Sequence, residues 1–357
     1  MSNNKSIGII ANPASGKDIR RLVAQGSVYD NNEKVNIIRR ILLGIKATGI
    51  TNVLYMPDYY HSIEKALDGI KLSFKPNKLD MKLLGKQSDS ITAGRLMAEK
   101  EVSCIITLGG DGTNRAVVKG SSVVPILPIS TGTNNVFPYM VEGTLAGMAA
   151  GVVAHGILPI EDITQRSNRL DVFIDGKFAD LALVDIAIYD DPFVGSRAVW
   201  DMSKVREIIF SLAKAAIMGL ASIGGALNCK NMDDQHGMHI VLSESDVNEG
   251  VEVIAPIAPG LINKLKIKEL SLLEEGDEVL VNHIPSVLAL DGEREIEVGS
   301  KKQVSIKFSK MGPLVLKVNK VLKAAAQANF FMQNTSSLRQ NECILKQLGL
   351  CKTPCDK

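Results

Sequence analysis

The chain has 357 residues, of which 45 % are hydrophobic and 22 % charged, as in an ordinary globular protein and unlike a disordered chain. Its 41 lysines and arginines against 39 aspartates and glutamates give a net charge of +2, which provides no electrostatic case for nucleic acid or an anionic membrane. The length suffices for two domains. Five cysteines, an odd number in a long chain, predict no disulfide framework and fit the reducing cytoplasm.

The first third of the chain alternates apolar strand patterns with helical periodicity. Short apolar runs are typical of buried strands, and apolar residues spaced three and four apart are typical of helices. Their alternation favours a parallel sheet covered by helices on both faces. We expect strands over residues 6–11, 52–56, 80–84, 102–108 and 123–129, and helices over residues 32–47, 60–72 and 88–100.

An alanine- and glycine-rich helix, predicted over residues 142–155, leads into a region with a different pattern. There Asp175-Gly176 and Asp291-Gly292 form tight-turn sequences between apolar runs, which favours β-hairpins. The apolar stretch 208–227 is interrupted by Lys214 and by glycines, so we expect a buried helix rather than a membrane span. Strands are predicted over residues 169–174, 177–188, 239–242, 279–282, 287–290, 294–298 and 303–308.

The expected architecture is an α/β N-terminal domain, with a parallel sheet and helices on both faces, followed by a β-rich C-terminal domain. We place an α/β nucleotide-binding domain at residues 1–145. A β-rich domain for substrate binding or oligomerisation would occupy residues 146–312, with a helical insertion at 201–226. The remaining residues, 313–357, would form a helix over 315–331 and a polar tail.

The strongest chemical signal is the sequence Thr107-Leu-Gly-Gly-Asp-Gly-Thr-Asn114, which directly follows a predicted buried strand. Ligands of open α/β sheets bind at the carboxyl ends of the strands. The three glycines let backbone amides approach phosphates, and a helix expected from about Asn114 would point its N-terminus at the same place. A carboxylate beside polyphosphate, here Asp111, is repelled unless a metal ion lies between them or it takes up a proton.

Two further polar turns follow neighbouring strands. Thr131-Gly-Thr-Asn-Asn135 follows the strand after the glycine loop and offers hydroxyl and amide groups to a ribose or phosphate. Asn12-Pro-Ala-Ser-Gly-Lys-Asp18 follows the first strand, and its Lys17 is a candidate phosphate contact. Neither the G-x-x-x-x-G-K-[ST] spacing nor a strand leading into G-x-G-x-x-G occurs, so a different phosphate-binding fold is indicated.

Taken in order, Asn12-Pro…Ser15-Gly16, Gly109-Gly-Asp-Gly-Thr113 and Thr131-Gly-Thr-Asn-Asn135 resemble the superfamily of NAD kinases, diacylglycerol kinases and sphingosine kinases. The fuller pattern of residues 12–22 is most similar to its acetoin catabolism protein X branch, which is ATP-NAD kinase-like. The resemblance covers roughly residues 5–325. It implies an active site between an α/β domain and a β-rich domain.

The resemblance also implies roles for individual residues. Asp111 would bind a metal ion or deprotonate the acceptor hydroxyl. Asp291-Gly-Glu293 resembles the lipid kinase turn that places a carboxylate near the metal or acceptor, and Ala182-Leu-Val-Asp185 resembles the Ala-Leu-Asn-Glu/Asp element of NAD kinases, with Val184 in place of Asn and Asp185 keeping the acid. The implied nucleotide-binding residues are Asn12, Ser15, Gly16, Lys17, Gly109, Gly110, Gly112, Thr113, Asn114, Thr131, Gly132, Thr133, Asn134 and Asn135.

The sequence therefore favours a cytoplasmic enzyme that uses ATP and Mg²⁺ to phosphorylate a hydroxyl of a small molecule, with NAD as the implied acceptor. Two alternatives stay open: a non-catalytic nucleotide-binding regulator linked to acetoin catabolism, and a kinase of another small alcohol or lipid. No nucleic acid or membrane partner is expected. The strand edges of the β-rich region leave homo-oligomerisation open.

Overall fold

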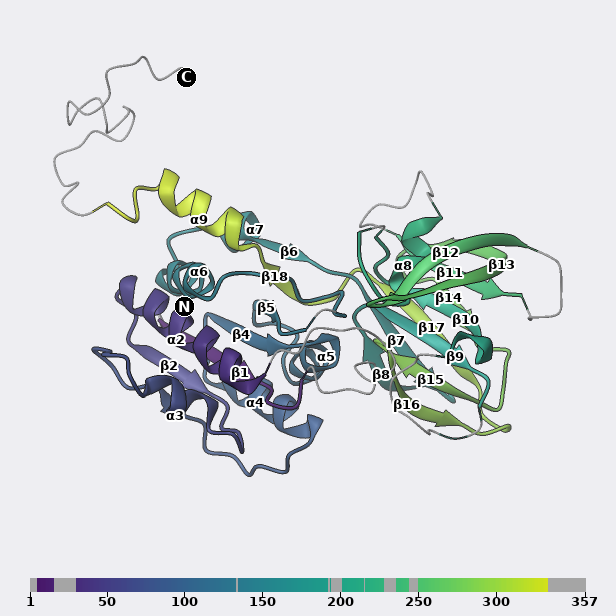
Figure 1. The fold of residues 1–357 in the computed structure, drawn as a ribbon, viewed down its shortest axis with the longest axis horizontal. Coiled ribbons are helices and arrows are strands. Elements are labelled where there is room, and N and C mark those ends of the chain that lie inside the picture. Colours follow the sequence, from purple (N-terminus) through teal and green to yellow (C-terminus); the bar gives the residue numbers. More distant parts are fainter. Residues whose placement is uncertain are drawn as a thin grey trace, which may run out of the picture.

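The protein has two lobes that lie side by side along its longest axis (Figure 1). One lobe mixes a sheet with helices, and the other consists mainly of strands. The computed structural model describes residues 5–15, 30–132, 134–191, 193, 201–214, 216–227, 236–243 and 250–332.

The first lobe is built on a seven-stranded sheet with the order β3-β2-β1-β4-β5-β18-β6. The pairs among its first five strands are parallel, as is the pair that β18 makes with β5, whereas β6 is antiparallel to β18. The chain therefore returns to this sheet after leaving the second lobe. The strands are β1 (Ser6–Ala11), β2 (Asn52–Tyr55), β3 (Asn77–Lys78), β4 (Cys104–Gly109), β5 (Ile126–Ser130), β6 (Thr164–Arg166) and β18 (Leu314–Leu316).

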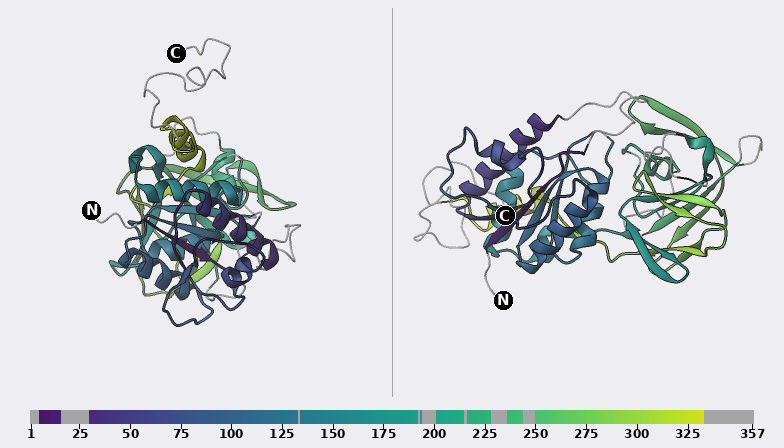
Figure 2. Two further views of the ribbon diagram at one scale, coloured as in Figure 1. Left: turned by 90° about the vertical axis from the view of Figure 1, so that its left-hand side faces the viewer. Right: turned by 90° about the horizontal axis from the view of Figure 1, so that it is seen from below.

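Helices cover both faces of this sheet, because successive residues of its buried strands point to opposite sides. Ile105 packs with Met97 and Val117 in the core under α4 and α5, whereas Ile106 packs with Ile38 and Ala146 in the core under α2 and α6. Figure 2 shows the two helix layers from other sides. The helices are α2 (Asn31–Ala47), α3 (Ser62–Leu67), α4 (Gln87–Glu99), α5 (Asp111–Gly120), α6 (Gly143–His155), α7 (Ile160–Ile163) and α9 (Val318–Gln327).

The second lobe is a sandwich of two antiparallel sheets, with the orders β12-β13-β11-β10-β9-β15-β16 and β14-β17-β7-β8. Leu170 and Phe308 of the smaller sheet pack against Ile188 and Leu288 of the larger one. Its elements are β7 (Arg169–Ile174), β8 (Lys177–Ala182), β9 (Asp185–Tyr189), η1 (Met202–Lys204), β10 (Val205–Phe210), α8 (Ala221–Ala226), β11 (Gly237–Leu242), β12 (Val251–Ala258), β13 (Leu261–Leu273), β14 (Glu278–Leu280), β15 (Ser286–Leu290), β16 (Glu293–Val298) and β17 (Val304–Ser309).

The fold class predicted from the sequence is confirmed: a parallel sheet between helices is followed by a β-rich lobe. The helical insertion predicted at 201–226 is wrong over its first part. Residues 205–210 form β10, a central strand between β9 and β11, and the insertion is helical only at η1 and α8. The β-branched and aromatic residues of β10 (Val205, Ile208, Ile209 and Phe210) fit a buried strand that is paired on both sides.

Three other segments differ in secondary structure from the prediction. The strand predicted at 80–84 is absent, and β3 lies at Asn77–Lys78 instead. Residues 314–316, assigned to a helix, pair with β5 and β6 as β18. The β12–β13 hairpin was not predicted, because its strands carry charged residues on the exposed side and no Asp-Gly turn joins them.

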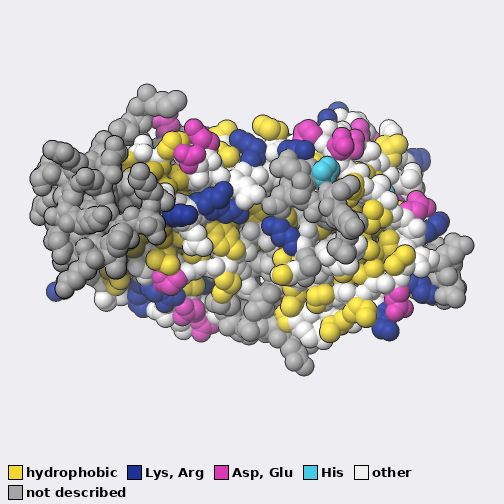
Figure 3. Space-filling model, turned by 90° about the horizontal axis from the view of Figure 1, so that it is seen from above, with side chains coloured by type: hydrophobic (Ala, Val, Ile, Leu, Met, Phe, Trp, Pro, Cys, Tyr) yellow, Lys and Arg dark blue, Asp and Glu magenta, His cyan; other side chains and the backbone are white. Residues whose placement is uncertain are grey.

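Within the part of the chain that the structure describes, no helix is long and apolar enough to span a bilayer. Figure 3 shows positive and negative side chains interspersed with apolar ones on the face seen from above, rather than a band of one charge. This mixture agrees with the balanced composition.

Helices α2 and α6 approach each other closely at paired glycines. A Cβ atom on Gly147 would lie 2.1 Å from the carbonyl oxygen of Ile41, and one on Gly44 would lie 2.3 Å from the carbonyl oxygen of Thr144. Both contacts are with backbone atoms, which cannot turn aside. The helix pair that covers one face of the first sheet therefore depends on these glycines.

We expect Gly147→Ala to lower the free energy of unfolding by about 1–3 kcal/mol, because the added methyl group must push the helices apart. Urea denaturation followed by circular dichroism measures the change. Gly299→Ala is the matched control, since a Cβ there would meet nothing within 4 Å. Equal stabilities of the two variants would contradict this account of the helix contact.

Candidate active site at the junction of the lobes

The glycine loop lies at the carboxyl end of the central strand β4, where the chain turns into α5. The strand ends at Gly109, Gly110 precedes the helix, and Asp111 is the first helical residue. The helix thus begins three residues before the predicted Asn114. The earlier start places the free amide groups of the first turn within the glycine loop itself, which makes this end of the sheet an anion-binding position.

The three glycines of the loop serve different purposes. A Cβ atom on Gly109 would lie 2.5 Å from the side chain of Thr113, and one on Gly110 would lie 2.7 Å from Oδ1 of Asn135. Both glycines are therefore required by the protein's own packing. A Cβ on Gly112 would lie 3.8 Å from the carboxyl group of Glu293, an ordinary contact distance. Only Gly112 leaves room above the loop that a ligand can fill.

Asn114 braces the loop from below. Its Oδ1 accepts a hydrogen bond from the hydroxyl of Thr107 (2.6 Å), and its Nδ2 donates to the carbonyl oxygen of Gly110 (2.9 Å). The residue is fully buried. Its side chain supports the loop's conformation and is not directed at a ligand.

The loop after β1 meets the glycine loop from the side. Asn12 donates from Nδ2 to Oγ1 of Thr113 (2.9 Å), and the hydroxyls of Ser15 and Thr131 lie 3.0 Å apart. Three polar turns that follow β1, β4 and β5 thus form one surface, as the sequence predicted from the parallel sheet. Gly16, Lys17 and Thr133 lie outside the described residues.

Lys34 was missed by the sequence analysis. It lies in the first turn of α2 and is 1 % exposed, on the same side as the apolar Ile38 and Ile41. Its position on an apolar helix face was the available signal, since a buried lysine needs polar partners. Its Nζ donates to three carbonyl oxygens of the loop after β1, those of Asn12 (3.0 Å), Pro13 (3.4 Å) and Ser15 (2.8 Å).

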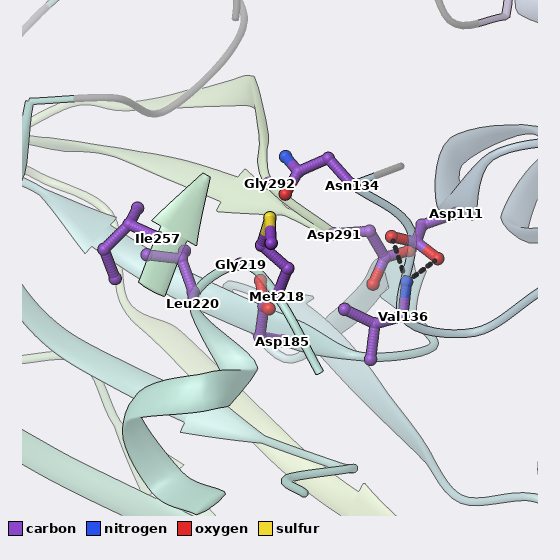
Figure 4. Close-up of a pocket in the computed structure, with 10 residues that line it drawn as sticks. All are labelled: Asp111, Asn134, Val136, Asp185, Met218, Gly219, Leu220, Ile257, Asp291 and Gly292. Atoms are coloured by element: carbon purple, nitrogen blue, oxygen red, sulfur yellow. Dashed lines mark hydrogen bonds between the residues drawn. The ribbon is translucent and has the colours of Figure 1, made fainter. Parts of the chain in front are cut away.

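The carboxylate of Asp111 is held by backbone amides. Its Oδ1 accepts from the amides of Val136 (3.1 Å) and Phe137 (2.8 Å), and its Oδ2 lies 3.2 Å from the Val136 amide. Figure 4 shows this contact at the edge of the pocket. The side chain thus fixes the turn after β5 to the start of α5. A carboxylate oxygen has two lone pairs and can accept from more than one group.

The two asparagines of the turn after β5 differ in their surroundings. Asn135 donates from Nδ2 to the hydroxyl of Ser130 (2.9 Å), and so it holds the turn together with Gly132. Asn134 faces the pocket between the lobes. Within the described part of the chain, its buried amide nitrogen and oxygen make no hydrogen bond. The amide of Asn134 is therefore available to a ligand.

Across the pocket, Asp291 occupies the turn between β15 and β16 with a positive φ of 52°. Its Oδ1 accepts from the backbone amides of Leu183 (2.9 Å) and Val184 (2.8 Å). The side chain of Val184 is 1 % exposed and packs in the core. The element that resembles the dinucleotide-binding segment of NAD kinases thus presents Asp185, and not residue 184, to the pocket.

Arg115, a second residue that the sequence analysis missed, lies one turn after Asp111 in α5 and is fully buried. Its guanidinium contacts Glu295 and lies 3.6 Å from Asp291 and 4.0 Å from Asp180. Burial works against its charge, but these carboxylates outweigh it and raise the pKa of Arg115. Its helical spacing from Asp111 was the only sequence signal.

Burial raises the pKa of Asp291 to about 6, against the opposing effects of Arg115 and the backbone amides. Three aspartates that the sequence predicted as site residues line the pocket, and each comes from a different element. They are Asp111 from α5, Asp185 from β9 and Asp291 from the turn after β15. Glu293 is not part of its lining and faces Gly112 instead.

The superfamily resemblance implies Mg²⁺, and the side chains near the pocket decide how this ion could be held. Among the described residues, no three His, Cys, Asp or Glu side chains cluster closely enough to hold a metal ion by themselves. Mg²⁺ in nucleotide enzymes takes one or two carboxylates and completes its shell with phosphate oxygens and water. The pocket carboxylates fit a Mg²⁺ ion that is also coordinated by phosphate oxygens and water, and not a Mg²⁺ ion held by protein side chains alone.

Two family models match the chain, one for each lobe. Residues 7–157 match the ATP-NAD kinase N-terminal domain, and residues 168–311 match the acetoin catabolism protein X C-terminal domain. The first lobe therefore has the fold of the ATP-NAD kinase N-terminal domain.

The family of the chain follows from a similarity that extends over most of its length. The acetoin catabolism protein X of Cupriavidus necator strain H16 is 36 % identical over 311 residues, which cover 84 % of this chain and 86 % of that protein. This chain belongs to the acetoin catabolism protein X family. The resemblance inferred from the three polar turns is thereby confirmed.

Solved structures similar to the chain come from two kinds of kinase. Yeast NADH kinase complexed with NADH has a TM-score of 0.47 and 11 % identity, over 94 % of this chain and 90 % of that one. A putative diacylglycerol kinase from Bacillus anthracis strain Sterne has a TM-score of 0.42 and 14 % identity, over 88 % of this chain and 98 % of that one.

The raised pKa of Asp291 predicts a pH dependence of stability. A folded pKa of about 6 against the ordinary 3.8 means that the native state binds this proton more tightly than the unfolded state. The contribution of Asp291 to stability is therefore present below pH 4 and is lost as the pH rises to 6. The total loss is on the order of 3 kcal/mol.

Urea denaturation of the wild type and of Asp291→Asn between pH 4 and pH 7 measures this effect, because asparagine tolerates the positive φ and does not titrate. The free energy of unfolding of the wild type should fall relative to the variant as the pH rises. A difference that grows in favour of the wild type with rising pH would refute the burial argument.

Proposed function

We propose that this protein is an ATP-dependent kinase that transfers a phosphoryl group to an alcohol hydroxyl. The observation that carries the proposal is the arrangement around the start of α5. Asp111, the first residue of this helix, lines a pocket that Asp185 and Asp291 of the β-rich lobe also line. A phosphate-binding helix end opposite acidic groups is the arrangement that phosphoryl transfer needs.

In this proposal the backbone of the glycine loop binds the phosphates of ATP. The first-turn amides of α5 point at the phosphates, while the packing of Gly109 and Gly110 keeps the loop rigid. Asn12, Ser15 and Thr131 hold the neighbouring turns in register with the loop. The nucleotide-binding roles of Gly16, Lys17, Gly132 and Thr133 remain predictions of the sequence resemblance.

Asp111 is the residue that would hold Mg²⁺, through Oδ2 and together with phosphate oxygens. The metal would neutralise phosphate charge during transfer. Because amides of Val136 and Phe137 fix the Asp111 carboxylate, its oxygens are positioned before a ligand arrives. Preorganised charge of this kind costs no reorganisation during reaction.

The acceptor hydroxyl would lie between Asp111 and Asp291. Its oxygen forms a bond to the γ-phosphorus as the bond to the β-phosphate oxygen of ATP breaks, ADP leaves, and the hydroxyl proton passes to a carboxylate. A carboxylate whose pKa burial has raised to about 6, as in Asp291, takes up a proton more readily than an ordinary aspartate. Asp185, Asp291 and Glu293 are the proposed acceptor-side residues.

NAD is the first acceptor to assay, because the superfamily resemblance implies it and because the N-terminal lobe matches the ATP-NAD kinase domain. The name of the C. necator relative connects this activity with acetoin catabolism. We place the reaction in the cytoplasm, where ATP and a reducing environment suit the chain's cysteines.

One observation favours a second function, that of a non-catalytic nucleotide-binding regulator. The carboxylate of Asp111 already accepts hydrogen bonds from two backbone amides, which gives it a structural role in the turn after β5. A regulator would bind ATP saturably and release no ADP. The kinase and the regulator therefore differ in turnover and not in binding.

Replacing Asp111 by Asn should lower the rate of ADP formation at least about 1,000-fold, because the amide binds Mg²⁺ weakly and cannot accept the hydroxyl proton. A coupled assay with Mg-ATP and NAD⁺, followed by detection of NADP⁺, measures turnover. Asp162→Asn changes an exposed aspartate in the first turn of another helix and is the control. Near-normal turnover of the Asp111 variant would contradict the proposed role of Asp111 in phosphoryl transfer.

Gly112→Ala separates ligand binding from folding. The methyl group has room in the protein and suits the first turn of a helix, so stability should be unchanged or rise by up to about 1 kcal/mol. If phosphates approach the amide of residue 112, the same methyl group should weaken ATP binding about tenfold or more. Calorimetric titration with Mg-ATP decides the matter, and unchanged affinity would remove Gly112 from the phosphate site.

A further inference from the structure

Lys34 carries a charge into the interior of the first lobe. It lies in the first turn of α2, and 1 % of its surface is exposed. Lysine is almost never buried this completely, because taking an ammonium group out of water is costly unless polar groups surround it. Three such groups belong to the loop after β1, residues 12–15.

The ammonium group of Lys34 fixes the backbone of this loop. Its Nζ lies 3.0 Å from the carbonyl oxygen of Asn12, 3.4 Å from that of Pro13 and 2.8 Å from that of Ser15. An ammonium group has three N–H donors, and hydrogen bonds from a charged donor are about twice as strong as those between neutral groups. Turning one of these carbonyls away would leave a buried charge with fewer partners, so the peptide groups keep their directions.

The side chains of the same loop contact the other two polar turns. Asn12 donates from Nδ2 to the hydroxyl oxygen of Thr113 in the first turn of α5 (2.9 Å), and the hydroxyls of Ser15 and Thr131 lie 3.0 Å apart. Asn12 and Ser15 are thus bound at their carbonyls by Lys34 and at their side chains by the neighbouring turns. The contact with Lys34 therefore determines where these two side chains lie beside the glycine loop.

Helix α2 is the rigid support behind this contact. Ile38 and Ile41, one and two turns after Lys34, are fully buried in the core under the first sheet. The loop's own bonds, such as the one from the Ser15 hydroxyl to the carbonyl oxygen of Asn12 (2.8 Å), keep the turn compact but do not connect it to a helix. Lys34 supplies such a connection.

The stability of the fold does not by itself require a charge at this position of α2. Replacing buried charges by apolar residues of similar volume is often neutral or stabilising, because the cost of desolvation disappears. An apolar residue at position 34 would continue the buried face that Ile38 and Ile41 form. The lysine is therefore better explained by the loop that it binds than by the core that it enters.

We propose that Lys34 is a positioning residue for nucleotide binding, whose ammonium group holds the loop after β1 where Asn12 and Ser15 complete the phosphate site beside the glycine loop. The N–H donors of Lys34 are directed at carbonyl oxygens of the loop, so its effect on a phosphate passes through that loop. The inference rests on the proposed function, because it takes the three polar turns as the binding site for ATP.

Calorimetric titration of the full-length protein with Mg-ATP tests this role. Lys34→Met removes the ammonium group and keeps an unbranched side chain, and it should weaken ATP binding about tenfold or more, because the loop loses its bonds to a charged donor. Lys46→Met is the matched control. Lys46 lies exposed in the last turn of the same helix and also donates to a backbone carbonyl, that of Lys71 (2.7 Å). Its replacement should leave the affinity unchanged.

Two further measurements distinguish positioning from a role in stability. Urea denaturation followed by circular dichroism gives the folded fraction of each variant, so a loss of affinity in fully folded protein is not a loss of fold. In the double variant with Asn12→Ala and Lys34→Met, the loss of ATP affinity should be smaller than the product of the two single losses, because both changes act on the same loop.

Lys34→Gln decides the question if the methionine variant does not fold. Its side-chain amide keeps two N–H donors and carries no charge, so it should weaken ATP binding by a smaller factor than methionine does.

The outcomes separate this inference from the proposed kinase activity. Equal affinities of the Lys34→Met and Lys46→Met variants, or single losses that simply multiply in the double variant, overturn the positioning role. If only the glutamine variant folds, an affinity equal to that of the wild type overturns it as well. A wild type that binds no Mg-ATP rejects both the inference and the proposed function. Weaker ATP binding by the Lys34 variants, without ADP formation by the wild type, upholds the role of Lys34 and rejects phosphoryl transfer.

Discussion

The buried charge of Arg115 is the interaction on which the junction of the two lobes depends. It lies in the helix that begins at the glycine loop, and its carboxylate partners come from the β-rich lobe. Removing one partner of a buried ion pair leaves an uncompensated charge and costs about 3–5 kcal/mol. The start of α5 is therefore held in a fixed position against the turn that carries Asp291.

Carboxylates of the site also hold its loops in place by accepting hydrogen bonds from backbone amides. Asp111 holds the turn after β5, and Asp291 holds the segment of Leu183 and Val184. Each carboxylate is thus held by backbone amides of a turn or bend that lies elsewhere in the chain. Carboxylates fixed in this way keep their geometry when a ligand enters, which suits chemistry that depends on positioning.

Sequence reasoning recovered the parallel sheet covered by helices and the position of the three polar turns, because each rests on local signals: apolar runs, helical spacing and glycine-rich turns at strand ends. It failed where pairing with neighbouring strands decides the secondary structure. Residues 205–210 became a strand because β9 and β11 flank them, and residues 314–316 became a strand because the edge of β5 was open. In both places tertiary pairing overrode local propensity.

The sequence by itself determined the α/β lobe and the place of its glycine loop, since a strand followed by glycines and a helix needs no distant partner to be recognised. Only the tertiary structure decided which residues brace that loop and which face the pocket. Lys34 and Arg115 look like ordinary surface charges in the sequence, yet both are buried. Val184, in the bend between β8 and β9, is buried in the core, whereas Asp185, the first residue of β9, lines the pocket. The sequence could not decide this, because the amides of Leu183 and Val184 are fixed by Asp291, which is far away along the chain.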